Sequence, residues 1–251
     1  MLLKDKNAVI YGGGGSIGGA VARTFAREGA RVFLAGRTLA KLDQVAGEIR
    51  SAGGTAHTAE VDALDETAVD DHADAVASQA GGIDISFNLI SRGHVQGTPM
   101  VEMAPEDYAG PVATAVRTTF LTSRAAARHM AAKGSGVILA FGGEGHPARG
   151  YRLGSLQTAF HAVESMRRQL ALELGPSGVR FVTLRTGGVP EAIPEGFERR
   201  EAIAEEIADS TLLGRAATLE DVGNVAAFVA SDRARSMTAA TVNVSAGALI
   251  D

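Results

Sequence analysis

Residues 7–20, NAVIYGGGGSIGGA, are the part of the chain that decides its fold. An apolar run at positions 8–11 ends abruptly in glycines, and the apolar residues that follow recur at helical spacing. This order predicts a strand, a glycine turn and a helix, a layout that directs backbone N–H groups and a helix N-terminus at a phosphate. Glycine suits such a turn because it adopts backbone angles that other residues avoid and lets a ligand approach closely.

The glycine spacing fits dinucleotide-binding patterns. Gly13-x-Gly15-x-x-Gly18 matches the G-x-G-x-x-G fingerprint, and Gly12-x-x-Gly15-x-x-Gly18 matches a related spacing. We also expect the Ser16 hydroxyl to cap the helix that follows. The residues expected to hold a dinucleotide at this turn are Gly12, Gly13, Gly15, Ser16, Ile17 and Gly18.

The same letters contain a competing motif. Gly14-x-Ser16-x-Gly18 also reads as the G-x-S-x-G elbow of a serine hydrolase. That motif needs a later acid and then a histidine, but the last histidine is His161, with 90 residues after it. We therefore treat the hydrolase as a remote alternative.

Composition bounds the class of protein. The 251 residues are 45% hydrophobic and 21% charged, which is typical of one ordinary globular domain. A net charge of −5 without a basic cluster argues against a nucleic-acid partner. No apolar run reaches the roughly 20 residues of a membrane span, and the apolar part of the first residues is too short for a signal peptide. With no cysteine there is no disulfide framework, and we expect a cytoplasmic protein.

Strand and helix patterns alternate along the whole chain. The alternation predicts an α/β fold with a doubly wound, Rossmann-type parallel sheet of about seven strands in a single domain, residues 1–251. Residues 105–133 form one long helical stretch, which we expect to be interrupted only at Gly110 and Pro111. Residues 187–218 are less regular and contain a charged helix at 197–209, so we expect them to be a lid over a pocket.

Arg37 bears on whether the expected dinucleotide is NAD or NADP. A site for NAD usually has an acid at the end of the second strand, whereas an arginine there accommodates the 2′-phosphate of NADP. Positions 35–37 hold no acid and end in Arg37, so the sequence favours NADP(H) over NAD(H), with a solvated arginine as the alternative. No metal site is expected, because the run of Asp70, Asp71, His72 and Asp74 is typical of a solvated helix face.

Several motifs in order resemble the short-chain dehydrogenase/reductase family along the whole chain. They are YGGGGSIGGA at 11–20, Val61-Asp62, DISFN at 84–88, LALELGPSGVRFVTL at 170–184 and LLGRAATLEDVGNVAAFVASDRARSMTAATVNVSAG at 212–247. The resemblance implies a Rossmann-type sheet, a nicotinamide cofactor and a homotetramer or homodimer. It also places Asp62, with Ala63 beside it, at the adenine and adds Asn88 to the cofactor site.

The catalytic residues of that family do not carry over. The family uses an Asn, a Ser, a Tyr and a Lys, and the resemblance puts these positions at Ala115, Gly143, Leu156 and Phe160. None of the four side chains can transfer a proton. The family's N-N-A-G segment also departs, reading Asn88-Leu89-Ile90-Ser91.

Other groups nearby are weak substitutes. Tyr151 is the candidate proton donor that we keep, because its glycine-rich loop could fold back; Glu144, His146 and His161 are weaker still. The loop after the fourth strand holds Ser91, Arg92, His94 and Gln96 at the carboxyl end of the sheet, where ligands bind.

Two functions therefore remain open. The first is an NADP(H)-dependent oxidoreductase that acts on a carbonyl or alcohol substrate with a rearranged proton donor. The second is a non-catalytic protein that binds a nucleotide or a partner and has kept only the fold. The sequence does not name a substrate. Two long helices, at 107–133 and 156–174, carry small residues that would suit close packing across a subunit interface; these are Ala125, Ala126, Ala127, Ala159 and Ala162.

Overall fold

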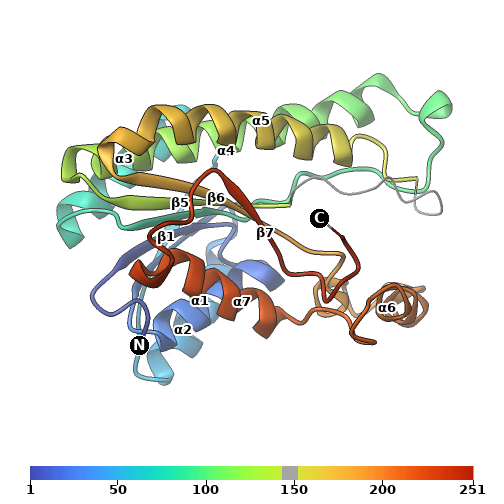
Figure 1. The fold of residues 1–251 in the computed structure, drawn as a ribbon, viewed down its shortest axis with the longest axis horizontal. Helices are drawn as coiled ribbons and strands as arrows, with labels where there is room; N and C mark the ends of the chain where they lie inside the picture. The colour runs from blue at the N-terminus through green and yellow to red at the C-terminus, as the bar shows by residue number, and fades with distance from the viewer. Residues whose placement is uncertain (143–151, 251) are drawn as a thin grey trace.

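A parallel sheet runs through the middle of the molecule, with strand order β3-β2-β1-β4-β5-β6-β7 (Figure 1). The computed structural model describes residues 1–142 and 152–250. The strands are β1 Asn7–Tyr11, β2 Arg31–Gly36, β3 Thr55–Glu60, β4 Ile85–Asn88, β5 Gly136–Phe141, β6 Val179–Arg185 and β7 Ala240–Asn243. The predicted doubly wound α/β fold is confirmed.

Helices cover both faces of the sheet. The helices are α1 Ser16–Arg27, α2 Leu39–Ser51, α3 Glu66–Ala80, α4 Pro105–Lys133, α5 Leu156–Leu174, α6 Arg200–Asp209 and α7 Leu219–Ala230. In Figure 1, α3, α4 and α5 lie on one side of the sheet and α1, α2 and α7 on the other, while α6 stands apart at one end. No helix in the described ranges is both long and apolar enough to cross a membrane.

The two helical layers explain why β1 is apolar from Ala8 to Tyr11. Ala8 and Ile10 belong to the hydrophobic cluster under α1, α2 and α7, whereas Val9 and Tyr11 belong to the cluster under α3, α4 and α5. Alternate residues of a strand point to opposite faces, so a strand covered on both faces is apolar at every position.

The order of the strands positions the site. The chain runs from β1 outward to β3 and then returns to add β4 on the other side of β1. Ligands of open parallel sheets bind at this reversal, beyond the carboxyl ends of the strands. The glycine turn after β1 and the loop after β4 therefore flank one crevice.

The N-termini of α7 and α1 differ in how they are capped. Thr218 caps α7 through a capping box with Asp221, in which each side chain accepts a backbone N–H of the other residue. The expectation that Ser16 caps α1 was wrong, because the N-cap residue is Gly15 and no side chain caps this helix. The N–H groups of the first turn of α1 are consequently free of side-chain acceptors.

The long fourth helix also differs from expectation. It runs without a break from Pro105 to Lys133, with Gly110 and Pro111 inside it. Pro111 lies in the second turn, where the missing N–H removes one helical hydrogen bond, and its buried ring contributes apolar contact.

The small residues on α4 and α5 serve the protomer itself. Ala125, Ala126, Ala127 and Ala159 are buried in the cluster between these helices and the sheet. Small side chains let the helices approach the strands closely. These four alanines therefore pack within the protomer, whereas Ala162, the fifth small residue of the prediction, is only half-buried. An interface on α4 and α5 stays a prediction.

Residues 187–218 lie beyond the carboxyl ends of β6 and β7. They hold a short 3-10 helix, Pro190–Ala192, and α6, which begins at Arg200 rather than at 197. The Ile207 side chain contacts Gly188, so α6 is held against the start of its own segment.

Candidate functional site

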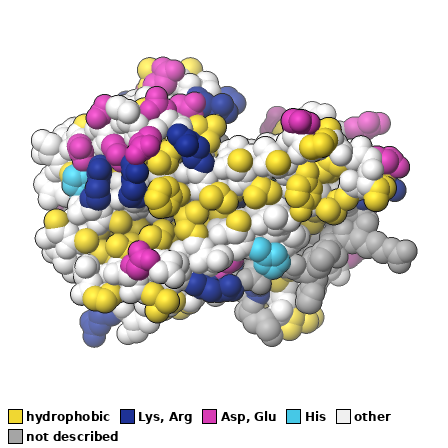
Figure 2. All heavy atoms as spheres, turned by 90° about the horizontal axis from the view of Figure 1, so that it is seen from above, with side chains coloured by type: hydrophobic (Ala, Val, Ile, Leu, Met, Phe, Trp, Pro, Cys, Tyr) yellow, Lys and Arg dark blue, Asp and Glu magenta, His cyan; other side chains and the backbone are white. Residues whose placement is uncertain are grey.

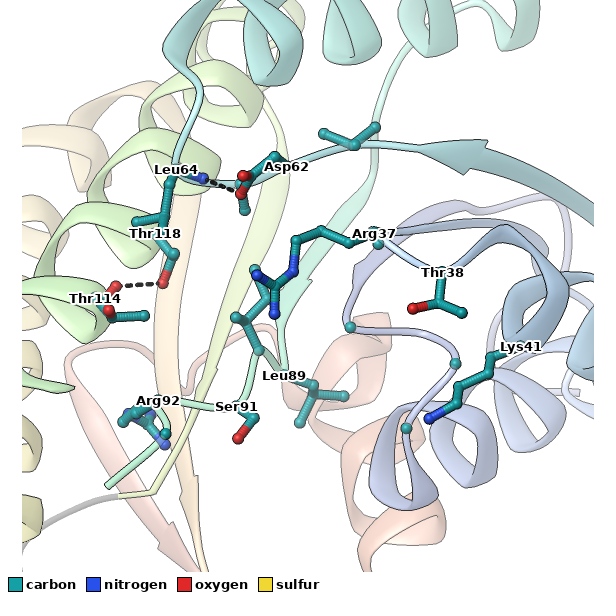
Figure 3. Close-up of a pocket in the computed structure, with 18 of the residues that line it drawn as sticks. Arg37, Thr38, Lys41, Asp62, Leu64, Leu89, Ser91, Arg92, Thr114 and Thr118 are labelled. Carbon is teal, nitrogen blue, oxygen red and sulfur yellow. Dashed lines mark hydrogen bonds between the residues drawn. The ribbon is translucent and has the colours of Figure 1, made fainter. Parts of the chain in front are cut away.

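A pocket of about 440 Å³ opens at the carboxyl edge of the sheet, at the reversal between β1 and β4 (Figure 3). Its lining comes from the glycine turn, the ends of β2 and β3, the loop after β4 and one face of α4. This volume is in the range of small-molecule and cofactor pockets.

The glycine turn forms one wall of the pocket and is as tight as the motif predicts. Gly12 has a φ of +80°, and its N–H donates to the carbonyl of Ala35 on the neighbouring strand at 2.8 Å. A Cβ on Gly18 would overlap the carbonyl oxygen of Gly12, so only glycine lets α1 start this close to the turn.

The expected turn residues divide into two groups. Gly12 and Gly15, together with Gly14, line the pocket. Gly13 and Gly18 are buried beneath it, and Ile17 packs against the core under α1. Ser16 is exposed at the first turn of α1, and its uncapped neighbourhood leaves N–H groups available to an anion. This cradle of glycine backbone and free amides fits the diphosphate of a dinucleotide.

Two cations lie across the pocket from α4. Arg37 follows β2 directly, and Lys41 is in the first turn of α2 (Figure 3). The Lys41 stem packs beside Gly14, where an added Cβ would come within 2.9 Å of the Lys41 Cβ. Within residues 1–142 and 152–250 neither cation forms an ion pair, so both charges are available to a ligand.

Asp62 and Ala63 form the rim next to Arg37. The Asp62 carboxylate accepts the N–H of Leu64 at 3.0 Å, and Ala63 is buried beneath it. Both residues line the pocket, as expected from the resemblance.

The Asn88 side chain makes hydrogen bonds within the protein. Its amide nitrogen lies 3.3–3.4 Å from the hydroxyls of Thr118, Thr119 and Thr122 on α4, and its oxygen accepts the N–H of Ile90 at 3.0 Å. Asn88 is buried and does not line the pocket. It fixes the loop after β4 to α4 and so supports the pocket wall. Its assignment to the cofactor site stays a prediction.

Of the four positions that the resemblance assigns to catalysis, Ala115 and Phe160 lie beside residues that line the pocket. Ala115 is buried on α4, next to the pocket-lining Thr114. Leu156 is the first residue of α5, and Phe160 lies one turn further along. Gly143, the candidate donor Tyr151, Glu144 and His146 lie outside the described residues, and His161 is exposed on α5.

The loop after β4 brings two polar side chains to the pocket. Ser91 and Arg92 both line the pocket. The Arg92 guanidinium lies over the Phe160 ring, 4.9 Å from the centroid, and its Nη2 donates to the carbonyl of Phe141 at 2.6 Å. An arginine therefore stands beside the position where the resemblance predicts a lysine.

Burial changes the titration of this loop. It lowers the pKa of Arg92 to about 10, which still leaves the guanidinium charged at neutral pH. Burial, and then the Arg92 charge, lower the pKa of His94, whose Nε2 lies 2.6 Å from the Gln96 amide nitrogen. Arg92 is thus the cation of the loop at neutral pH.

The acidic run on α3 is engaged elsewhere. Asp70 pairs with Arg124 at 2.8 Å, and Asp74 lies 2.7 Å from the His129 ring. Within the described ranges, no group of three or more His, Cys, Asp or Glu side chains is placed to hold a metal ion.

The chain matches known proteins over its whole length. The family model described as Enoyl-(Acyl carrier protein) reductase matches residues 13–248. L-rhamnose 1-dehydrogenase (NAD(P)(+)) of Azotobacter vinelandii is 30% identical, over 100% of this chain and 99% of that protein. Meso-2,3-butanediol dehydrogenase of Serratia marcescens is 31% identical, over 99% and 96%.

The chain belongs to the short-chain dehydrogenase/reductase family. A solved structure described as 7α-hydroxysteroid dehydrogenase complexed with NADH and 7-oxo glycochenodeoxycholic acid is similar, with a TM-score of 0.88 and 26% identity over 99% of this chain and 96% of that one. Members of this oxidoreductase family bind NAD(P)(H), which agrees with the glycine cradle.

Sequence reasoning missed some lining residues. Lys41 and Thr38 were not assigned to the cofactor, although their position just after Arg37 in the first turn of the next helix is a usable signal. Thr114 and Thr118 line the pocket because one face of α4 meets it, which depends on how the helix is rotated. Ser91 and Arg92 were placed at the correct edge of the sheet.

Proposed function

We propose that this family member is an NADP(H)-binding oxidoreductase that acts on a carbonyl or alcohol substrate without the family's usual proton-transfer residues. The observation that carries the cofactor preference is the pair Arg37 and Lys41 at the mouth of the pocket, with no acid at positions 35–37. Titration of the protein with NADPH and with NADH tests it directly.

The residues for holding the cofactor follow from the pocket. Gly12, Gly14 and Gly15 with the start of α1 would hold the diphosphate. Arg37 and Lys41 would bind the 2′-phosphate, because paired cations and phosphate oxygens form charge-assisted hydrogen bonds. Asp62 and Ala63 would border the adenine. The bound nicotinamide would supply or accept a hydride.

The residues of the chain must orient the reactants and supply the proton. Hydride transfer depends largely on orientation, which a rigid pocket wall such as the Asn88–α4 contact provides. Ala115, Gly143, Leu156 and Phe160 hold no group that could move a proton. We therefore expect ordinary ketones and aldehydes to be reduced slowly, with Tyr151 kept as the candidate donor.

Two further features belong to the proposal. Residues 187–218 contribute none of the described lining of the pocket, so a lid made from them would have to swing toward it.

A homodimer or homotetramer is proposed from family membership. The exposed face of α4 and α5 suits such an assembly, because Phe120 and Leu172 are exposed there and hydrophobic side chains run along it (Figure 2).

A further inference from the structure

The guanidinium of Arg92 is largely buried, and among the described residues no anion lies beside it. Nη2 donates to the Phe141 carbonyl, and the guanidinium carbon lies over the Phe160 ring. Nε is fully buried without a hydrogen-bond partner. No carboxylate of residues 1–142 or 152–250 forms an ion pair with this arginine. A sheltered charge without a counter-charge is unfavourable, so the site favours a ligand that brings an anion.

Arg92 lies at the end of the pocket away from the residues to which the cofactor phosphates are assigned. Figure 3 shows Arg92 and Ser91 across the pocket from Thr38 and Lys41. The 2′-phosphate is assigned to Arg37 and Lys41, and the diphosphate to the glycine turn. The Arg92 charge is left for the second reactant.

The surroundings of Arg92 fix the guanidinium in one orientation. The guanidinium carbon lies over the Phe160 ring, and the Phe141 carbonyl accepts a hydrogen bond from Nη2. A planar, fixed guanidinium suits carboxylate oxygens, which it binds with parallel hydrogen bonds. Ser91, exposed next to it, adds a hydroxyl at the same end of the pocket.

We propose that the substrate carries a carboxylate and that Arg92 binds it. This inference rests on the proposed function, because it takes the other cations of the pocket to be occupied by the cofactor. It makes Arg92 a specificity-determining residue. A substrate with a neutral group in the place of the carboxylate leaves the Arg92 charge uncompensated.

The test compares acids with their neutral amides. The protein is saturated with NADP⁺, so that no reduction takes place, and titrated in a calorimeter with three pairs: pyruvate and pyruvamide, acetoacetate and acetoacetamide, 4-acetylbenzoate and 4-acetylbenzamide. We expect at least one acid to bind ten times or more tightly than its amide. In Arg92→Gln the preference should fall below about threefold, and Arg92→Lys should keep part of it.

Two variants serve as controls. Arg128→Gln makes the same change on α4, where Arg128 pairs with Asp70 and Asp74 away from the pocket, and should leave the preference intact. Phe160→Leu keeps the charge but removes the ring that orients it, and should weaken the preference several-fold. If Arg92→Gln does not fold, the proposal is tested by Phe160→Leu and Arg92→Lys instead. An acid preference that is unchanged in both variants would overturn it.

The proposal is overturned if the wild-type protein prefers no acid over its amide, or if the preference survives in Arg92→Gln. Failure of NADP⁺ to bind would instead refute the proposed function. In that case the same pairs are titrated into the cofactor-free protein, where loss of the acid preference in Arg92→Gln still supports the role of Arg92 and its survival still refutes it.

Discussion

The guanidinium carbon of Arg92 lies 4.9 Å from the centre of the Phe160 ring. Phe160 is on α5, at the position where the family resemblance predicts a lysine, and Arg92 is in the loop after β4. A cation from one element thus rests on an aromatic ring from another, an arrangement that stabilises by about 0.5–2 kcal/mol. The effect of a substitution at either residue on stability should therefore depend on which side chain is present at the other.

Phe160→Lys should destabilise the protein. The new ammonium would lie beside the Arg92 guanidinium, and two like charges about 5 Å apart near a protein surface repel by about 1–3 kcal/mol. At about 2–4 °C per kcal/mol for a chain of this size, calorimetry should show Tm lower by several degrees. Phe160→Leu, the uncharged control, should lose less, and Arg92→Gln should restore stability to Phe160→Lys. Equal stability of Phe160→Lys and Phe160→Leu would contradict the arrangement.

Simple ketones and aldehydes should be reduced slowly or not at all. A positioned acid or base contributes about 10²–10⁴ in rate, and Leu156 and Phe160 supply none. Because such groups act as a unit, Leu156→Tyr alone should rescue nothing. The combined Gly143→Ser, Leu156→Tyr and Phe160→Lys change would be needed, with Arg92→Gln to accept the lysine. NADPH consumption with a panel of carbonyl compounds measures this.

Fast turnover of a simple carbonyl compound by the wild-type chain, at the roughly 1–10³ s⁻¹ usual for enzymes, would contradict that expectation. Tyr151→Phe would then be the first variant to make. A loss of 10²-fold or more in that variant would identify Tyr151 as the donor.

The protein should form a homodimer or homotetramer. Phe120 and Leu172, exposed on α4 and α5, would be covered in the assembly, and such apolar exposure favours association. Light scattering should give two or four times the 25.8 kDa of one chain. Phe120→Asp should shift the mass toward one chain, whereas a wild-type mass of 25.8 kDa would rule out the assembly.

Stability should fall as the pH drops below 6.5, in part because of His72. Burial lowers its pKa to about 4 in the folded protein, where its ring packs edge-on against Tyr11 at 5.8 Å between centroids. Between pH 6.5 and 4 the unfolded chain binds this proton and the folded one does not, so protonation favours unfolding. By pH 5 the loss is about 2 kcal/mol. Urea unfolding at pH 7.5 and pH 5 should show a smaller loss of stability in His72→Leu than in the wild type. An equal loss in the two proteins would show that His72 does not cause it.

The fold could be predicted because it follows from local sequence patterns. The strand, glycine turn and helix at the start of the chain are set by neighbours in sequence. Ser16 was misjudged because a capping role depends on where the helix begins, and the chain starts α1 one residue beyond Gly15. The sequence did not show that Ala125, Ala126, Ala127 and Ala159 are buried within the protomer, because composition does not show which way a helix face points.

The candidate site was predicted in part. Arg37 and Asp62 follow neighbouring strands of a parallel sheet, so their place at the pocket followed from topology. The sequence did not show that three threonine hydroxyls of α4 surround the Asn88 amide, because that contact depends on the register between a strand and a helix. The stacking of Arg92 on Phe160 joins segments far apart in the chain and has no local signal.

The most direct test of the account is calorimetric titration of the wild-type protein and Arg37→Ala with NADPH and with NADH. Hydrogen bonds to a charged group contribute about 1.5–3 kcal/mol, so NADPH should bind the wild type about 10- to 100-fold more tightly than NADH. Arg37→Ala should lose most of that difference while its affinity for NADH stays the same, and Arg31→Ala, at the opposite end of the same strand, should behave as the wild type. Tighter binding of NADH by the wild type, or unchanged NADPH affinity in Arg37→Ala, would contradict the account.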